Sequence, residues 1–464
     1  MTTTPSSPGR VGAVVLAAGK GTRFRSERPK VLHAVAGRTM LRWVLEALRP
    51  LGLQRVVVVV GHHGDDVRAE AETAGLDGLV VVDQAEQRGT GHAVRVTADA
   101  GALDGLDTVL VLPGDVPLMQ AAPLGVLLAS HAGHAATLLT TELDDPTGYG
   151  RVLRNADGRV ERIVEESDAD EAQRAVGEVA TSVYAFAGTE LVGALATLRS
   201  DNVQGEEYLT DVVELLRPVA AVRANATVVA GVNDRRQLAD AGAVLRRRIL
   251  DALMRDGVTV VDPAATYVGP DVVVRPDAVL LPGTHLEGGT RVEGDAVVGP
   301  DSRLVDAVVQ RGATVAHSVL LGASVGPGAV VGPFAYLRPG VRLEAGAKAG
   351  SFVEMKQTVV GENSKVPHLS YLGDATVGRD VNVGAGTITC NYDGRAKHPT
   401  VIEDGAFIGS DTMLVAPVRV GTRAVTGAGS AITKDVSPAA LAVERAQQRT
   451  VPGYADRGTS EGGP

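Results

Sequence analysis

Apolar residues recur every six positions in the second half of the chain, with glycine or proline close by. Seven successive aliphatic residues keep this spacing, namely Val268, Val274, Leu280, Leu286, Val292, Val298 and Leu304. The spacing returns at Val319, Val325, Val331, Leu337 and Leu343, then at Val377 and Val383, and again at Ile402, Ile408, Leu414 and Val420. An α-helix repeats about every 3.6 residues and a strand alternates about every two, so neither explains the pattern. A hexad with its own turn is typical of a parallel β-helix, whose stacked coils bury the repeated aliphatic side chain.

The repeat is interrupted at residues 305–318, 350–376 and 384–401. Insertions in a solenoid map to surface loops, so we expect loops at these places. Reactive residue types gather there, and they are Glu354, Lys356, His368, Tyr371, Asn391, Tyr392 and Lys397. With about 18 residues per coil, the segment 268–432 predicts about nine coils.

The first half follows a different pattern, in which short β-branched runs alternate with helical stretches. We expect strands at residues 11–17, 55–60, 79–82, 108–112 and 136–143, and helices such as 40–51 and 92–99. This order predicts a doubly wound, Rossmann-like α/β domain, whose ligands bind beyond the carboxyl ends of the strands. A long helix is expected over 234–256, with Leu238, Leu245, Ile249 and Leu253 on one stripe.

These patterns predict five segments along the chain. Residues 1–10 and 455–464 are expected to be disordered tails. The α/β domain covers 11–233, a linker helix covers 234–262, and the β-helix covers 263–454.

Composition excludes several classes of protein. Lysine and arginine total 45 against 55 acidic residues, a formal charge of −10, so nucleic acid is not an expected partner. The longest apolar runs, 11–18 and 56–60, are shorter than the roughly 18 residues that span a bilayer, so no membrane insertion is expected. Cys390 is the single cysteine, and its lack of an intrachain disulfide partner fits a cytoplasmic protein.

Two polar motifs follow expected strands of the α/β domain. The glycines of LAAGKGTR (16–23) let backbone N–H groups approach a phosphate, and Lys20 and Arg23 can neutralise its charge. The motif has neither the Walker A spacing nor the G-x-G-x-x-G spacing, because Gly21 follows Lys20 and Phe24 follows Arg23. Asp115, in LPGDVPL (112–118), could hold Mg²⁺ against a polyphosphate or could cap a turn. The two motifs support each other, because both fall at the carboxyl ends of strands.

Several further motifs carry a resemblance to known enzymes. LAAGKGTR, PKVLH (29–33), QAEQRGTGHA (84–93), GDVPL and DDPTGYGR (144–151) look like the sugar-nucleotide pyrophosphorylases. The β-helix adds FVEMK (352–356), HLSYLGDA (368–375) and NVGAGTITCNYDG (382–394). Together, in order from about 11 to 454, they closely resemble the bifunctional GlmU family. In that family an N-acetylglucosamine-1-phosphate uridyltransferase is fused to a glucosamine-1-phosphate acetyltransferase on a left-handed β-helix of hexapeptide repeats.

The resemblance implies roles for residues of the first domain. The nucleotide or its sugar product would be held by Leu16, Ala17, Ala18, Gly19, Lys30, Gln84, Gly89, Thr90, Gly150, Glu165 and Asn233. Arg23 and Lys30 would be the catalytic cations that face the phosphates of UTP, and Asp115 and Asn233 would bind Mg²⁺. One position departs from the family's E-V-N-x-G pattern, because Ala180 stands where a sugar-contacting asparagine is expected. A lost neutral hydrogen bond costs about 0.5 to 1.5 kcal/mol, so we expect weaker or altered sugar binding in an active domain.

The same resemblance implies roles in the second domain. His368 would be the general base, with Glu354 nearby. Glucosamine-1-phosphate would be bound by Arg338, Lys356, Tyr371, Asn382 and Lys397. Acetyl-CoA would be bound by Ala385, Asn391, Tyr392, Ser410, Ala428 and Arg445. Enzymes of this kind are homotrimers, and the resemblance implies that neighbouring chains complete the acetyl-CoA site.

Three other interpretations stay open at the level of the sequence. The β-helix could serve only assembly or regulation of a single-activity nucleotidyltransferase, as in the ADP-glucose pyrophosphorylases. The chain could be a non-catalytic interaction protein, although intact Lys20, Arg23, Lys30, Asp115 and Asn233 argue against that. A metal hydratase would need histidine ligands, and His285, His317, His368 and His398 are too unevenly placed to supply them.

Overall fold

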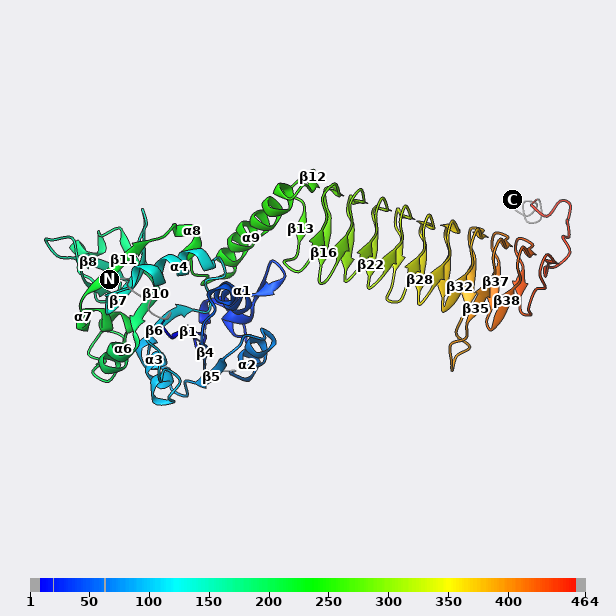
Figure 1. Ribbon diagram of the computed structural model, residues 1–464. Helices are drawn as coiled ribbons and strands as arrows, with labels where there is room; N and C mark the ends of the chain where they lie inside the picture. Colours follow the sequence, from blue (N-terminus) through cyan, green and yellow to red (C-terminus); the bar gives the residue numbers. More distant parts are fainter. Residues whose placement is uncertain (1–8, 20, 62–63, 456–464) are drawn as a thin grey trace, which may run out of the picture. The chain divides into compact units, whose positions relative to one another are not determined.

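The computed structural model describes residues 9–19, 21–61 and 64–455, which form two compact units (Figure 1). One unit extends to Leu245 and the other begins at Arg246. Lys20 and nearly all of the two expected tails lie outside the described residues.

A mixed nine-stranded sheet forms the centre of the first unit. Its main path has the order β11-β7-β10-β6-β1-β4-β5, with β8 and β9 attached through β10. The strands are β1 (Val11–Leu16), β4 (Arg55–Val60), β5 (Leu79–Asp83), β6 (Thr108–Pro113), β7 (Ala136–Glu142), β8 (Arg151–Arg154), β9 (Val160–Val164), β10 (Glu178–Ala187) and β11 (Val219–Arg223). β1 lies parallel to β4 and β6, whereas β10 runs antiparallel to β6 and β7. A separate small pair is formed by β2 (Ala34–Val35) and β3 (Arg38–Thr39).

The sheet is buried on both faces, which confirms the doubly wound arrangement. On one face lie α3 (Thr90–Asp99), α6 (Gly188–Leu195) and α7 (Val212–Leu215), and on the other lie α1 (Met40–Leu48), α2 (Gly64–Thr73), α4 (Ala121–Ser130) and α8 (Ala226–Val229). In β4, Val57 and Val59 join the first core, and Val56 and Val58 join the second. A strand buried on both faces needs such an unbroken aliphatic run. The observed strands therefore begin and end within one residue of the expected ranges. The short α5 (Glu171–Arg174) lies outside these two layers.

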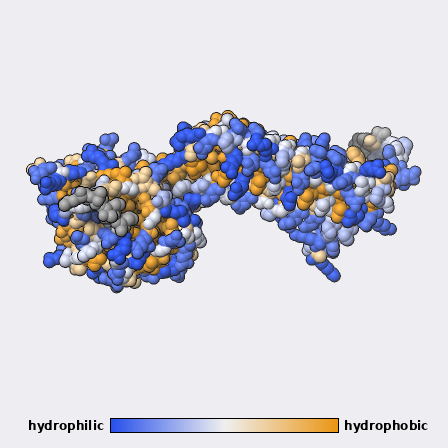
Figure 2. All heavy atoms as spheres, viewed as in Figure 1, coloured by the Kyte–Doolittle hydropathy of each residue, from blue (hydrophilic) through white to orange (hydrophobic). Residues whose placement is uncertain are grey.

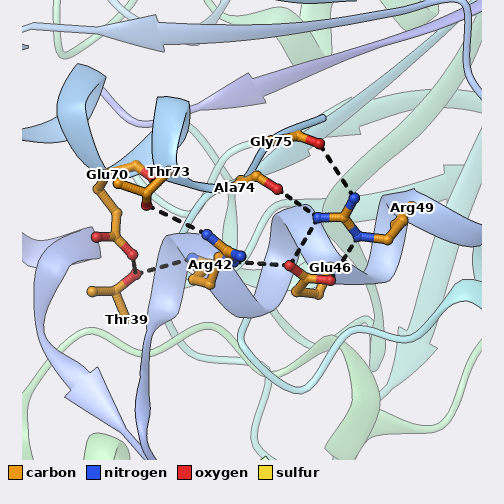
Figure 3. A network of polar contacts seen from close by, with 8 residues as sticks. All are labelled: Thr39, Arg42, Glu46, Arg49, Glu70, Thr73, Ala74 and Gly75. Carbon is orange, nitrogen blue, oxygen red and sulfur yellow. Dashed lines mark hydrogen bonds and ion pairs between the residues drawn. The ribbon is translucent and has the colours of Figure 1, made fainter. Parts of the chain in front are cut away.

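Polar contacts tie α1 to α2 on one face of the sheet (Figure 3). Thr39 caps α1 by accepting a hydrogen bond from the Arg42 backbone N–H at 3.1 Å, and its hydroxyl donates to Glu70 Oε1 at 2.7 Å. Past the other end of α1, Arg49 donates to the Ala74 carbonyl oxygen at 2.6 Å. An N-cap of this kind contributes about 1 kcal/mol, and the contacts fix both ends of α1 against its neighbour.

Helix α9 (Arg235–Arg255) runs through the division between the two units. Leu238 and Leu245 pack in a core cluster of the first unit. Ile249 and Leu253 pack against the core of the second unit. The expected apolar stripe is therefore present, and it contributes to two different cores.

The second unit is a parallel β-helix of three sheets, in which each strand pairs with the strand three further along the chain, except that Val425–Thr426 pairs with Leu441–Ala442 at the end (Figure 1). The first sheet contains β12 (Thr259–Val260), β15 (Val279–Leu280), β18 (Val297–Val298), β21 (Thr314–Val315), β24 (Val330–Val331), β27 (Lys348–Ser351), β30 (Lys365–His368), β33 (Asn382–Val383), β36 (Phe407–Ile408), β39 (Val425–Thr426) and β41 (Leu441–Ala442). The second contains β13 (Tyr267–Val268), β16 (His285–Glu287), β19 (Arg303–Val305), β22 (Val319–Leu321), β25 (Tyr336–Leu337), β28 (Glu354–Lys356), β31 (Tyr371–Gly373), β34 (Ile388–Cys390), β37 (Met413–Val415) and β40 (Ala431–Ile432). The third contains β14 (Val273–Val274), β17 (Arg291–Val292), β20 (Val308–Val309), β23 (Ser324–Val325), β26 (Arg342–Leu343), β29 (Val359–Val360), β32 (Ala375–Val377), β35 (Thr400–Ile402) and β38 (Val418–Val420). This is the architecture of the expected left-handed β-helix.

The register of the repeat differs from the expectation at one position. Val319 is 37% exposed, whereas Leu320 is fully buried, so the inward residue is one place later than the hexad count predicts. Consecutive inward residues are mostly six apart, but Val315, Leu320 and Val325 are five apart. A turn that is one residue shorter keeps the strands stacked and shifts the count along the sequence.

Two of the three expected loops were wrong. Residues 305–318 carry β20 and β21, and residues 350–376 carry regular strands from β27 to β32. Their inward residues stay buried, and these are Val309, Val315, Met355, Val360, Val366 and Leu372. Five-residue steps also fall at these places, from Leu304 to Val309 and from Met355 to Val360, and counting by sixes loses the pattern there. Only 384–401 contains an insertion, a hairpin that leaves the coil between β34 and β35 (Figure 1).

Four of the reactive residues therefore lie on strands. Glu354, Lys356, His368 and Tyr371 stand on strands β28, β30 and β31 and not on loops. Met355 and Leu372 point into the core, so their neighbours Glu354, Lys356 and Tyr371 point outward. His368 is exposed at the end of β30, so all four reactive side chains lie on the outside of the coil. Asn391, Tyr392 and Lys397 do lie on the inserted hairpin.

Apolar side chains also form a row along one corner of the β-helix, where strands of the first sheet turn into strands of the second. Phe334, Phe352 and Leu369 stand there with exposed fractions of 56, 60 and 63%. The two phenyl rings stack with their centroids 5.2 Å apart. Figure 2 shows apolar side chains at the surface of this unit among hydrophilic ones. Within the described ranges, no helix is both long and apolar enough to cross a membrane.

Two candidate active sites

A cluster of charged and polar side chains lies beyond the carboxyl ends of β1 and β6. Lys30, in a short 3-10 turn, forms an ion pair with the Asp115 carboxylate and donates to Asn233 Oδ1 at 3.1 Å. Arg23 donates to the same Asn233 oxygen at 3.0 Å. The Val232 N–H donates to the Asp115 carbonyl at 3.0 Å, which fixes the segment before α9 against the loop after β6. Four residues that lie up to 210 positions apart in the sequence are thus brought together.

The oxygens of this cluster fit a divalent cation. The Asp115 carboxylate and the Asn233 amide oxygen both contact one Lys30 ammonium, so they converge on a single cation position. Mg²⁺ takes oxygen ligands, and it usually binds one or two protein oxygens together with water and substrate phosphates. Across the described ranges, no group of three or more His, Cys, Asp or Glu side chains is arranged to hold a metal ion. A metal bound here would therefore rely on its substrate for further ligands.

The loop after β5 and the start of α3 form the other side of this site. Gln84 is buried and donates from Nε2 to the Gly89 carbonyl at 3.2 Å. Gly89 has a φ of 107°, and a Cβ there would lie 2.5 Å from the Glu207 carbonyl oxygen, so only glycine fits. The Thr90 hydroxyl accepts from the Leu209 N–H at 3.0 Å. The Gln87 side chain reaches the Ala18 carbonyl, which links this loop to the backbone of Leu16, Ala17, Ala18 and Gly19.

Gly150 and Glu165 lie close together and form a third part of the site. A Cβ at Gly150 would lie 3.5 Å from both Glu165 carboxylate oxygens and 2.9 Å from Ile163 Cγ2. Burial raises the pKa of Glu165, and Thr210 donates to its Oε1 at 3.0 Å. The buried Ala180 donates from its backbone N–H to the Gly150 carbonyl at 2.8 Å. The residue that departs from the expected pattern therefore stands beside the residues implied to bind the sugar.

The second cluster stands on the outer face of β28 and β31. Arg338 donates to Glu354 Oε1 at 3.0 Å, and Glu354 pairs in register with Tyr371 on the next coil. Lys397, from the hairpin, lies against Lys356 and lowers the pKa of its ammonium. Two ammonium groups held side by side repel each other unless an anion lies between or above them. The arrangement therefore suits a phosphate.

The sequence motifs did not single out Gly373 and Asp374, which complete this cluster. Asn391 donates to Asp374 Oδ2 at 2.5 Å. A Cβ at Gly373 would lie 2.5 Å from the Tyr371 hydroxyl and 2.6 Å from Asn391 Nδ2, so any larger residue would displace both side chains. Asn391, implied to bind acetyl-CoA, thus lies with the sugar-phosphate residues. The sequence signal that could have identified Gly373 and Asp374 is the LGD of HLSYLGDA, which lies two coils along from Arg338.

Hydrogen bonds within the inserted hairpin hold Lys397 in place. The Asp393 carboxylate accepts from the Arg395 and Ala396 N–H groups at 2.7 Å each, and it contacts His398 Nε2 at 2.8 Å. These donors hold the pKa of the Asp393 carboxyl well below its usual range. Tyr392 pairs with Lys397 across the hairpin. Asp393 and His398 were not expected at this site, and the only local signal was an Asp-Gly turn.

The residues implied to bind acetyl-CoA form a column along the corner between the first two sheets. Ala385, Ser410 and Ala428 each stand three residues after register partners of the first sheet. Their carbonyls accept hydrogen bonds from the next coil: Asp411 N–H to Ala385 at 2.6 Å, Gly429 N–H to Ser410 at 2.8 Å, and Arg445 Nη1 to Ala428 at 2.9 Å. His368 belongs to the same column, because it pairs with Ser351 at this corner.

The side chains of three expected residues make no hydrogen bond to the described residues of these groups. The His368 imidazole is exposed and makes no hydrogen bond to any other described residue, while the Glu354 carboxylate bonds to Arg338. Asn382 lies on the first sheet with Lys365 and Phe407 as register neighbours, away from the row on the second sheet. Tyr392 is 61% exposed at the hairpin.

Comparison with known proteins gives consistent matches. The family model described as a MobA-like NTP transferase domain matches residues 13–207. The Bifunctional protein GlmU of Thermobifida fusca is 50% identical to this chain over 462 residues, which are 97% of this chain and 95% of that protein. The protein of the same name from Pelotomaculum thermopropionicum is 53% identical, with 96% and 98% covered. The one from Streptomyces avermitilis is 50% identical, with 96% and 94% covered.

Proposed function

The chain belongs to the bifunctional GlmU family, and we propose that the two clusters described above are its two active sites. The enzyme transfers an acetyl group from acetyl-CoA to glucosamine-1-phosphate, and it transfers a uridylyl group from UTP to N-acetylglucosamine-1-phosphate with release of pyrophosphate. One observation carries the assignment of the sites. Each unit holds a lysine beside a second cation, Lys30 with Arg23 and Lys356 with Lys397, in a place that suits a phosphate.

In the uridyltransferase site a phosphate oxygen of the sugar phosphate attacks the α-phosphorus of UTP, and the bond to the leaving pyrophosphate breaks. Arg23 and Lys30 lie where they can neutralise charge that develops on the phosphates. Asp115 and Asn233 would hold Mg²⁺, which supplies further charge neutralisation and orientation when bound. Gln84, Gly89 and Thr90 would hold the uridine, and Gly150 and Glu165 the sugar, so that the reacting atoms are aligned.

In the acetyltransferase site the amino group of the sugar attacks the thioester carbonyl carbon. His368 would take the proton that the nitrogen loses, and the C–S bond breaks to release CoA, whose thiolate then takes up a proton. Arg338, Lys356 and Lys397 would hold the 1-phosphate, with Tyr371 and Asn382 on the sugar. The corner column of Ala385, Ser410 and Ala428 ends beside His368, so a thioester bound along it with Arg445 would reach the base. Asn391 and Tyr392, which lie at the hairpin, would contact acetyl-CoA from a neighbouring copy.

The proposed assembly is a homotrimer. The corner that carries His368 also carries the exposed row of Phe334, Phe352 and Leu369. Three large apolar side chains exposed side by side favour a protein contact. A second copy packed there would cover the row and bring new groups to His368, whose imidazole has no orienting partner within the described part of its own chain.

We place the enzyme in the cytoplasm, where UTP and acetyl-CoA are available.

The decisive experiment measures release of the CoA thiol from acetyl-CoA with glucosamine-1-phosphate as acceptor and glucosamine-6-phosphate as the control. We expect release with the 1-phosphate alone. Lys356→Gln should raise the KM for the acceptor, whereas the matched change Lys348→Gln, on another sheet, should not. Folded protein that turns over UTP but releases no thiol would leave a single-activity nucleotidyltransferase with a structural β-helix.

Sedimentation of the full chain tests the trimer, which a monomer at micromolar concentration would contradict.

A further inference from the structure

Gln84 and His92 form a buried polar pair at the nucleotide end of the first unit. Their exposed fractions are 4% and 6%. Gln84 Nε2 lies 3.2 Å from the Gly89 carbonyl oxygen and 3.0 Å from His92 Nδ1. His92 lies in the first turn of α3, two residues after Thr90. The pair therefore connects the helix to the loop that would hold the uridine.

These contacts fix which way the side-chain amide of Gln84 faces. A backbone carbonyl only accepts hydrogen bonds, so the Gln84 atom that contacts Gly89 must be the NH₂ group. That group has two hydrogens, and Gly89 and His92 take one each. His92 Nδ1 must then be the acceptor, which makes the imidazole neutral with its proton on Nε2. The amide oxygen of Gln84 makes no hydrogen bond with any other described residue, so it is the atom left for a ligand.

We propose that His92 is a positioning residue that holds the Gln84 amide oxygen toward the nucleobase and thereby selects uracil over cytosine. This inference rests on the proposed uridyltransferase site. Uracil carries an N–H donor at N3, whereas cytosine carries a lone pair at N3 and an amino group at the neighbouring carbon. A fixed acceptor pairs with uracil N3–H and faces cytosine N3 with another lone pair, and a buried acceptor left unpaired strongly disfavours binding.

Burial, with the charges around it, favours the neutral state of His92 that this role needs. Burial lowers the pKa of His92, and the Arg88 and Arg95 guanidinium groups lower it further, against the opposite effects of Glu207 and Glu86. Arg95 is itself paired with Glu207 at 2.7 Å, which offsets part of both effects. Protonation of His92 would turn Nδ1 into a donor that faces the Gln84 NH₂ group. The amide would then lose its second anchor, so selectivity should weaken under acid conditions.

The experiment compares kcat/KM for UTP and CTP, with N-acetylglucosamine-1-phosphate as acceptor, in the full chain and its variants. His92→Leu removes the acceptor at similar volume and should reduce the UTP/CTP ratio by about tenfold or more. His92→Gln supplies an amide oxygen and should restore most of the ratio. His131→Leu is the matched control, because His131 is equally buried in the same unit but bonds to Thr137. It should leave the ratio unchanged.

Each outcome separates the inference from the proposed function. A wild-type chain that does not turn over UTP would refute the uridyltransferase assignment itself. Turnover of UTP with a UTP/CTP ratio that His92→Leu leaves intact would refute only the role of His92. If His92→Leu does not fold, as judged by its melting curve, His92→Met replaces it, since methionine fills irregular space and is a weak acceptor. The wild-type ratio, measured from pH 7.5 downward, should fall on acidification, while that of His92→Gln should not.

Discussion

The five-residue step before Leu320 makes a sharp prediction about two adjacent residues. Leu320 is fully buried in the core of the β-helix, whereas Val319 is 37% exposed on its outer face. Replacing a buried leucine with alanine costs about 2 to 5 kcal/mol of folding free energy, because it leaves a cavity. Val319→Ala removes two carbon groups worth about 0.8 kcal/mol each when fully buried. At roughly two-thirds burial, the Val319 change should cost about 1 kcal/mol.

Urea unfolding of the full chain measures this difference. Far-ultraviolet circular dichroism follows the strands of the β-helix, and fluorescence of Trp43, the single tryptophan, follows the first unit. Stacked repeats do not unfold as one two-state unit, so midpoints are compared instead of extrapolated free energies. Leu320→Ala should lower the circular dichroism midpoint clearly more than Val319→Ala, and neither should move the Trp43 transition.

The opposite ranking would refute the reasoning. A strict hexad count places Val319 inside and Leu320 outside, so it predicts that Val319→Ala is the damaging change. A larger shift for Val319→Ala would therefore mean that the turn before β22 has its full length. Equal small shifts would mean that neither side chain is needed to fill this coil.

Three further predictions concern single residues or pH. His368→Ala should lower acetyl transfer by about 10² to 10⁴ and leave UTP turnover unchanged, and an unaltered rate of CoA release would remove His368 from the mechanism. Ser182 has a left-handed φ of 58° at a bulge in β10. Glycine adopts this conformation without strain, so Ser182→Gly should raise the free energy of unfolding by up to about 1 kcal/mol. A lower urea midpoint would instead show that the serine side chain makes a stabilising contact. Burial lowers the pKa of His33, His92 and His131, so the unfolded chain takes up their protons first as the pH falls below about 6.5. The urea midpoint of the Trp43 transition should therefore fall between pH 7.5 and 5.5, and a midpoint that rises would contradict the neutral state of these side chains.

The α/β unit was predictable because each of its strands is an unbroken aliphatic run. Burial on both faces demands such runs, and residues 55–60 contain little else. The antiparallel β10 was not predicted, because nothing local distinguishes a strand that reverses direction in a mixed sheet. The residues around Lys30 were found through their motifs. Their convergence on Asn233, which lies 203 positions further on, depends on the sheet order and not on any local pattern.

The β-helix shows where a periodic pattern stops being informative. Val319, Leu320 and Leu321 are all aliphatic, so a shift by one residue still places an apolar side chain inside. Only the stacking of β22 on β19, which pairs Leu304 with Leu320, settles which one points inward. The same shortened steps made two strand-rich segments look like loops. For that reason Glu354 and Lys356 were expected on surface loops, although they stand on strand β28.

The placement of Asn382 shows how the coil geometry limits what one chain can enclose. In the row of Arg338, Lys356 and Tyr371, the last two stand on the second sheet and Arg338 directly follows its strand β25, whereas Asn382 stands on the first sheet. The outer faces of two sheets of one coil point away from each other, so they share only the corner at which His368 stands. A single convex corner cannot surround a substrate. If Asn382 and the cation row both contact glucosamine-1-phosphate, they must therefore come from different chains that face each other. The proposed trimer would supply such a second chain, and His368 would then stand at the contact between copies.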